Sequence, residues 1–225
     1  MKRILNFVWL FTFIVSLVLI NSCKKSSSVN GLVSQTTEVY TNNGIVQTTQ
    51  IQYTYDGQGR QIQAVSTGNT NSTTTYNYST AGKVIKTVGS STTTYTLNSQ
   101  GLVYYDGISD FTYTNGYLTR QVDSTSIDSF VTNTVTNGNI TLIVFSLNGT
   151  QIDISYQYTS VKDYRNYGLS FLGKTNTDNV LTQQTQGDVI NYTYQYDSEG
   201  RVTQQTSSLS GGSTTDVFTY TYVSN

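Results

Sequence analysis

Along most of this chain, hydrophobic and polar residues alternate one by one within short segments. From residue 35 onward, aromatic or β-branched residues take every second position, and threonine, glutamine, asparagine or serine stand between them. Turn residues interrupt the alternation about every ten positions. A period of two places successive side chains on opposite faces of a strand. The pattern therefore predicts an all-β domain of short antiparallel strands.

Aromatic residues recur two positions apart in several of these segments. The sets are Tyr53 and Tyr55, Tyr76 and Tyr78, Tyr156 and Tyr158, Tyr192, Tyr194 and Tyr196, and Phe218, Tyr220 and Tyr222. Residues two apart on a strand project from one face, so we expect these rings to form the core side of the sheet. An alternative is that the tyrosines line a groove that stacks sugar rings or holds an aliphatic ligand. The candidates for such a ligand face are Tyr53, Tyr76, Tyr78, Tyr192 and Tyr194.

Asparagine–glycine pairs mark hairpin turns between the strands. They occur at 43–44, 115–116, 137–138 and 148–149. Both residues tolerate the positive φ that a type I′ turn requires. These four sites are therefore predicted to be tight hairpins.

A longer turn motif occurs twice. Its residues are Tyr55, Asp56, Gly59 and Arg60 in the first copy, and Tyr196, Asp197, Gly200 and Arg201 in the second. The aspartate side chain can cap the backbone amides two residues on, and the glycine can take the left-handed conformation that returns the chain. Degenerate copies surround Gly82, Gly101 and Gly116, at intervals that shrink along the chain. A drifting interval indicates a hairpin meander and not a strict solenoid.

These two motif copies resemble the YD repeat of RHS-type proteins. The chain is too short for the large RHS shells, and it is more similar to small envelope lipoproteins of Gram-negative bacteria with a porin-like or open-barrel β fold. In that group a late segment like residues 166–181, followed by a tyrosine-rich hairpin, also recurs. The resemblance implies a fold and a location, and it implies no catalytic residues.

The expected architecture is an antiparallel up-and-down meander that forms a strongly curved sheet or an open or partial barrel. Residues 140–147 are the most continuously apolar stretch, which is typical of a strand buried on both faces. We expect the segment 161–172 to cover that strand's second face, as a short helix or a plug across the barrel mouth. Open sheets need charged protection of their edges. The candidates are Lys83, Lys86, Arg120 and Lys162.

The N-terminus has the pattern of a bacterial export signal. Lys2 and Arg3 precede an apolar run over residues 4–20, and the only cysteine, Cys23, follows shortly after. The run is also about long enough to cross a bilayer as an uncleaved helix. Residues 19–23, however, resemble the bacterial lipobox, which implies lipid transfer to the Cys23 thiol and cleavage before it.

These features divide the chain into three parts. We expect a signal peptide over residues 1–22, a lipidated cysteine and flexible tether over 23–34, and a single β-meander domain over 35–225. A lipoprotein's acyl chains hold it firmly on a membrane, because each buried methylene contributes about 0.8 kcal/mol. The predicted location is the cell envelope, as an outer-membrane lipoprotein. The sequence does not decide between the periplasmic face and the cell surface.

Composition narrows the chemistry available to the mature chain. Histidine is absent, and a lipidated Cys23 leaves no free thiol. Zinc or copper sites built from Cys and His are therefore excluded, as are Ser-His-Asp and Cys-His catalysis in their usual forms. Loss of Lys2 and Arg3 leaves 10 basic residues against 13 acidic ones. This mildly acidic balance disfavours nucleic-acid binding. We expect no metal and no cofactor.

Three functions remain open. The first is a monomeric, non-enzymatic envelope protein that binds a glycan, a lipid or an envelope protein, or that has a structural role. The second is a carboxylate-dependent glycoside hydrolase or lyase, since such chemistry needs only two placed carboxylates. Its first candidates are Asp106, Asp110 and Asp123, although aspartates beside turns usually cap them. The third is a periplasmic carrier of apolar cargo.

Overall fold

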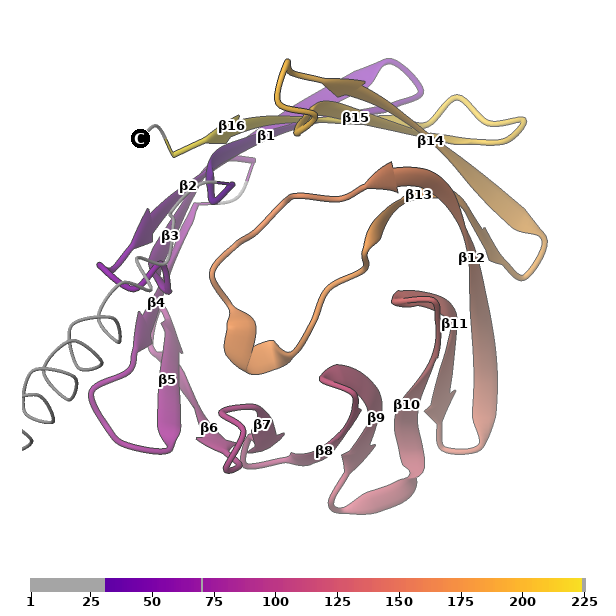
Figure 1. Ribbon diagram of the computed structural model, residues 1–225. Helices are drawn as coiled ribbons and strands as arrows, with labels where there is room; N and C mark the ends of the chain where they lie inside the picture. The colour runs from indigo at the N-terminus through magenta and orange to yellow at the C-terminus, as the bar shows by residue number, and fades with distance from the viewer. Residues whose placement is uncertain (1–30, 70, 224–225) are drawn as a thin grey trace, which may run out of the picture.

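A computed structural model of the protein describes residues 31–69 and 71–223. In this part of the chain, sixteen strands form one closed antiparallel barrel (Figure 1). The first eight are β1 (Val33–Asn42), β2 (Ile45–Tyr55), β3 (Gln61–Gly68), β4 (Ser72–Asn77), β5 (Lys83–Val88), β6 (Ser91–Leu97), β7 (Val103–Tyr105) and β8 (Ser109–Thr114). The others are β9 (Tyr117–Asp123), β10 (Ser126–Thr136), β11 (Asn139–Leu147), β12 (Thr150–Lys162), β13 (Asp178–Thr185), β14 (Asp188–Tyr196), β15 (Val202–Leu209) and β16 (Thr215–Tyr222).

The meander is confirmed, and the barrel is closed where an open or partial one was expected. Strands β1 and β16 pair along most of their length, with Thr36 opposite Tyr220 and Glu38 opposite Phe218. Closure removes the unpaired edges that an open sheet would expose. The predicted edge-protecting role of Lys83, Lys86, Arg120 and Lys162 is therefore wrong.

The aromatic face of the strands lies inside the barrel. Residues directly opposite each other on neighbouring strands share a face, so the register of β2 against β3 places Tyr53 beside Ala64. The ring of Tyr53 meets Tyr167, which belongs to a loop inside the lumen, in an edge-on contact of 5.3 Å between centroids. The intervening positions, such as Thr54 and Thr193, consequently point outward and are exposed.

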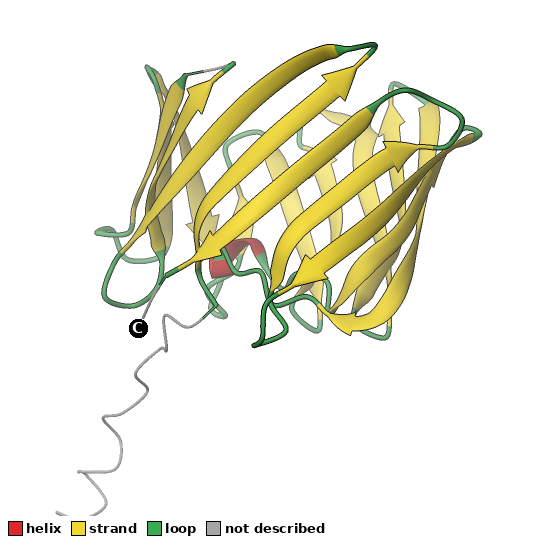
Figure 2. Ribbon diagram, turned by 90° about the horizontal axis from the view of Figure 1, so that it is seen from above, coloured by secondary structure: helices red, strands yellow, loops and turns green. Residues whose placement is uncertain are grey.

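The two ends of the barrel differ. The two long motif turns, the start of β1 and the end of β16 lie at one end, and that end is also where η1 (Ser170–Leu172) sits (Figure 2). Asn115 and Asn137 turn the chain at this end, while Asn43 and Asn148 turn it at the other. All four have positive φ, between 49° and 53°, and each is followed by a positive-φ glycine. The four predicted tight hairpins are thus confirmed.

Residues 163–177, between β12 and β13, form a plug that projects into the lumen (Figure 1). A short helix or plug was expected near 161–172, and η1 lies there. The plug does not cover β11, however. Its Phe171 packs against the rings of Tyr76, Tyr78 and Tyr95 on the far wall. Strand β11 is therefore not buried on both faces, since Phe145 is 39% exposed.

The hydrophobic core consists of two small clusters at the plugged end. One contains Val33, Val202 and Tyr220, and the other is built around Phe171 of the plug. Leu32 and Val33 are almost fully buried, at 2% and 0% exposed. The barrel domain thus begins before residue 35, and the expected tether over 23–34 is too long at its C-terminal end. Packing within these two clusters attaches the plug to the barrel wall.

Candidate functional site

The plug contacts the wall at successive points around the plugged end. The carbonyl of Asn166 accepts a hydrogen bond of 2.9 Å from the Val33 amide of β1, and the Gly168 carbonyl accepts one of 3.1 Å from the Gln61 amide of β3. Farther along the plug, the Lys174 amide donates to the Gly116 carbonyl at 2.8 Å in the β8–β9 turn. The plug therefore closes this end as a floor attached on several sides.

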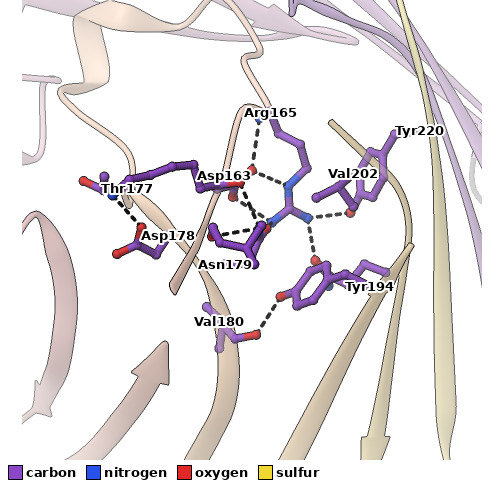
Figure 3. Close-up of polar contacts among 12 residues, drawn as sticks. Asp163, Arg165, Thr177, Asp178, Asn179, Val180, Tyr194, Val202 and Tyr220 are labelled. Carbon is purple, nitrogen blue, oxygen red and sulfur yellow. Dashed lines mark hydrogen bonds and ion pairs between the residues drawn. The ribbon is translucent and has the colours of Figure 1, made fainter. Parts of the chain in front are cut away.

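Arg165 anchors the first arm of the plug to strands β13, β15 and β16 (Figure 3). Its guanidinium forms an ion pair with Asp163 at 2.7 Å. It also donates to the Tyr220 hydroxyl at 3.0 Å and to the side chain of Gln205. The Tyr194 ring lies 5.8 Å from the guanidinium carbon. Burial lowers the pKa of Arg165, but the hydrogen bond and charge of Asp163 outweigh burial and raise it.

Asn139 holds the returning arm of the plug at the β10–β11 turn. Its side-chain oxygen accepts hydrogen bonds of 2.9 Å from the amides of Thr177 and Asp178. Its side-chain nitrogen donates to the Asp178 carboxylate at 2.8 Å, which also pairs with Lys162 at 2.7 Å. Sequence analysis assigned no role to Arg165 or Asn139. An isolated basic residue in an irregular segment was the one available signal for Arg165.

The two copies of the long turn motif have one geometry. The Asp56 carboxylate accepts hydrogen bonds from the amides of Gln58 and Arg60, at 2.9 and 3.0 Å. It also pairs with the Arg60 guanidinium at 2.6 Å, which lies over the Tyr78 ring at 4.4 Å. Gly59 has φ of 74°. Burial raises the pKa of Asp56, but the hydrogen bonds from Arg60 and Gln58 have the larger combined effect and lower it.

The second copy repeats these contacts at the neighbouring side of the barrel. Asp197 accepts from the amides of Glu199 and Arg201, both at 2.9 Å. The Arg201 guanidinium pairs with Asp197 at 2.8 Å and lies 4.7 Å from the centre of the Tyr222 ring. In both copies the aspartate and arginine hold the turn and the next hairpin's tyrosine. The motif residues are thus occupied by contacts within the fold.

Several tyrosines donate a hydrogen bond to a backbone carbonyl of the preceding strand. The bonds run from Tyr55 to the Val33 carbonyl, Tyr78 to Gln61, Tyr158 to Ile140, Tyr194 to Val180 and Tyr222 to Val202, at 2.5 to 2.9 Å. Burial raises the pKa of Tyr78 and of Tyr222 to about 12. Of the five ligand-face candidates, Tyr78 and Tyr194 are thus used in this way, and Tyr192 donates to Gln183 at 3.0 Å.

Tyr53 and Tyr76 remain, and the structure brings them together. They line a cavity of about 420 Å³ between strands β2–β5 and the plug. The plug contributes Tyr167 and Leu169, and the wall contributes Lys86 and Gln61 among others. Burial raises the pKa of Tyr53 and of Tyr76. This cavity on the lumen side of the plug is the candidate ligand site.

A larger cavity, of about 1060 Å³, lies at the plugged end itself. It is lined chiefly by plug residues between Asp163 and Thr175 and by the β8–β9 turn. The Lys174 ammonium lies 5.4 Å from the centre of the Tyr117 ring there. Most of its lining residues belong to the plug itself, so the irregular path of the plug accounts for the size of this cavity.

The candidate carboxylates are engaged by their own turns. Asp106 accepts from the amides of Ile108 and Ser109, at 3.0 and 2.7 Å. Asp123 accepts from the amide and hydroxyl of Thr125, at 2.7 and 2.6 Å. Asp110 is exposed. Among the described residues, no group of three or more Cys, Asp or Glu side chains could hold a metal ion. The turns thus account for Asp106 and Asp123.

No family model matches the chain, and no curated protein is similar to it in sequence. Solved structures do resemble it. A porin-like protein from Bacteroides uniformis ATCC 8492 matches with a TM-score of 0.68 and 18% identity, over 85% of this chain and 98% of that one. A porin-like protein from Bacteroides vulgatus ATCC 8482 matches with a TM-score of 0.58 and 12% identity, over 86% and 99%.

These matches confirm the porin-like fold that the sequence resemblance implied. They connect the chain to closed barrels, and they provide no link to RHS-type repeat proteins. Cys23 and the apolar run before it lie outside the described residues. Within residues 31–69 and 71–223, no helix is long and apolar enough to cross a membrane.

Proposed function

We propose that the protein is a lipid-anchored, non-enzymatic component of the cell envelope whose barrel is a cup. The plug forms the floor, the aromatic strand faces form the inner wall, and the opposite end is the mouth through which a ligand enters. The observation that carries this proposal is the direction of the side chains. Most rings point inward to the plug and lumen, and threonine, glutamine and asparagine take many outward positions, although Phe130 of β10 points outward.

The outer wall supports an anchored barrel over one that spans a bilayer. Barrels in membranes present an apolar band to lipid, flanked by aromatic girdles. Here the outward positions of β2, β4 and β14 include Gln50, Gln52, Thr75 and Asn191. Strands that cross a bilayer need about 9–11 residues. Strands β4 to β9 have three to seven residues each.

The position of the first described residues orients the cup. The chain enters the barrel at the plugged end, where Val33 binds the plug. Cys23 lies eight positions before Gly31, and eight residues extend at most about 28 Å. A lipid anchor at Cys23 would therefore keep the plugged end near the membrane and leave the mouth facing away from it.

Cell fractionation tests whether the barrel is anchored or inserted. Residues 1–23 are exchanged for a cleavable secretory leader that lacks cysteine, and the native chain is the control. The native chain should need detergent for extraction. The exchanged protein should leave the periplasm by osmotic shock as a folded barrel, because nothing else holds it. Retention of the exchanged protein in the outer membrane would overturn the anchored-cup model.

An apolar cargo is a second candidate, and the β11–β12 wall favours it. Phe145, Leu147 and Ile152 face the lumen near the mouth and are 39%, 67% and 38% exposed. Burying such surface against an acyl chain contributes about 25 cal/mol per Å². Organic extraction of the purified chain, followed by mass spectrometry, should then yield a lipid other than the anchor. An extract that contains anchor fragments alone removes the support for this cargo.

A further inference from the structure

The cavity beside the plug combines aromatic rings with polar groups from the wall. Tyr53, Tyr76 and Tyr167 line it together with Lys86 and Gln61, and small hydroxyl side chains of β3 and β4 complete it. Its volume of about 420 Å³ falls within the range of about 300–1,000 Å³ that is usual for small-molecule sites. The plug bounds the cavity on one side and strands β2 to β5 bound it on the other, so the cavity lies at the floor of the cup.

Gln61 lines this cavity and carries an unmet acceptor that protein atoms enclose. The residue is 3% exposed, and its side-chain oxygen Oε1 has no hydrogen-bond partner in the described part of the chain. A buried acceptor without a donor is unfavourable, and a partner that supplies one relieves the cost. The backbone of Gln61 is fixed by its bond to Gly168 of the plug. Rotation of the side-chain amide toward the cavity would let a ligand O–H or N–H satisfy the oxygen.

Lys86 brings a cation. It lies opposite Tyr76 in the β4–β5 register, on the lumen face. The ion pairs found in the described residues do not include it. Lys83, three residues earlier on β5, is exposed. Lys86 therefore presents an ammonium group, next to the Tyr76 ring, that is available to an anion.

The rings determine what kind of anion fits. Tyr53 and Tyr167 meet edge to face at 5.3 Å, and Tyr76 is tilted against Phe171 at 6.1 Å, so the plug holds each wall ring in place. Fixed aromatic faces beside hydroxyl groups suit a sugar ring, which is apolar on its faces and polar at its edge. A plain acyl chain would leave the Lys86 ammonium without a partner.

We propose that this cavity binds an anionic sugar, with its carboxylate or phosphate on the Lys86 ammonium and a ring hydroxyl donating to Gln61. The inference rests on the proposed function, because it takes the lumen as the ligand site, and it adds the ligand's class. The anion can belong to a uronic acid or to a sugar phosphate. Both present the same charge to Lys86.

Calorimetric titration of the full chain in detergent tests the ligand class. The probes are digalacturonate, trehalose 6-phosphate and neutral trehalose, at low salt. At least one charged disaccharide should bind ten-fold or more tightly than trehalose, and the identity of that probe separates the two sources of the anion. Equal binding of trehalose and both charged probes, or no binding by any probe at about 10 mM, would overturn the proposal.

Variants locate the binding. Lys86→Gln should weaken the charged probe at least ten-fold and leave trehalose unchanged, whereas Lys83→Gln on the outer face of the same strand should change neither. Gln61→Leu should weaken binding without lowering the melting temperature, because it removes a buried acceptor that lacks a partner. An unchanged affinity in Lys86→Gln, with the fold intact by circular dichroism, would contradict the assignment.

The anchored cup is judged separately from its ligand. If the charged probes fail while native mass spectrometry of the full chain with envelope extracts shows another adduct, the sugar assignment falls and the cup remains. If the barrel is instead retained in the outer membrane after exchange of residues 1–23, the cup model falls whatever the titration shows.

Discussion

Polar side chains inside the lumen differ in whether they have hydrogen-bond or ion-pair partners. Arg165 has a carboxylate, a hydroxyl and two rings around it. Asp216, opposite Tyr40 on the lumen side of β16, has no ion-pair partner in the described residues, and its Oδ1 has no hydrogen-bond partner there. Satisfied groups hold the fold, and unsatisfied ones cost stability unless a ligand or solvent meets them.

Arg165 is predicted to be the most costly charged residue to remove. Arg165→Met leaves the Asp163 carboxylate unpaired in a largely buried site, which should cost about 3–5 kcal/mol in the free energy of unfolding. Urea unfolding of the full chain in detergent measures it. Arg60→Met is the matched control, since Arg60 also pairs with an aspartate and a ring but is more exposed. It should cost about 1–2 kcal/mol. Equal losses in the two variants would refute the anchoring role of Arg165.

Asp216 should make stability depend on pH. Burial, with the charge of Glu38 in second place, raises its pKa to about 6. A carboxyl that binds its proton more tightly when folded adds stability at low pH, and this gain is lost as pH rises from about 4 through 6. Asp216→Asn should therefore raise the melting temperature by a few degrees at pH 7.5 and not at pH 4. A difference of the same size at both pH values would contradict this assignment.

At the scale of elements, the plug is what makes one end of the barrel a floor. It bonds to the start of β1 and to the turns after β2, β8 and β10, and Phe171 contributes its largest buried ring. Both core clusters include or contact plug residues. We therefore expect the plug and the wall at this end to unfold together.

Gly168 tests the close approach of the plug. A Cβ there would lie 2.5 Å from the Gly59 carbonyl oxygen, and its φ is +67°, whereas a Cβ at Gly44 would meet nothing within 4 Å at a φ of +81°. Both glycines share the cost of a left-handed alanine, about 1–2 kcal/mol. Gly168→Ala should lower stability by roughly 1–3 kcal/mol more than Gly44→Ala. Thermal melts of the two variants measure the difference, and equal melting temperatures would show that the plug yields without cost.

At the scale of the whole molecule, closure and side-chain direction together define a lumen, a plugged end and an open mouth. Most rings of the strands face the lumen and many outward positions are polar, as the proposed anchored cup requires. The plugged end lies next to the start of the described chain, and the mouth lies at the other end (Figure 2).

Energy transfer to a membrane dye should report this orientation. Ser198 is exposed in the turn at the plugged end, and Ser210 is exposed in the turn at the mouth. Strand β15, with eight residues, separates the two turns by roughly 20 Å along the axis of a tilted barrel. A fluorophore on Ser198→Cys should transfer energy to the membrane dye more strongly than one on Ser210→Cys. The reverse order would place the mouth against the membrane.

The sequence by itself determined what depends on neighbours along the chain. Alternation with period two predicts the strands, and the Asn–Gly pairs predict tight hairpins such as Asn43–Gly44. The motif around Asp56 predicts a capped turn, because its donors lie two to four residues away. The inward set of tyrosines was also readable, since residues two apart on a strand always share a face.

Tertiary structure alone decided closure, the path of the plug and the partners of its anchors. The pairing of β1 with β16 joins residues more than 170 positions apart, and no local pattern encodes that meeting. For the same reason Arg165 looked isolated in the sequence, since Tyr220 lies 55 residues away. Tyr53, Lys86 and Tyr167 share a cavity only because the closed wall curves around the plug. Side-chain direction is a local property, but what a side chain meets depends on which distant strands and loops surround it.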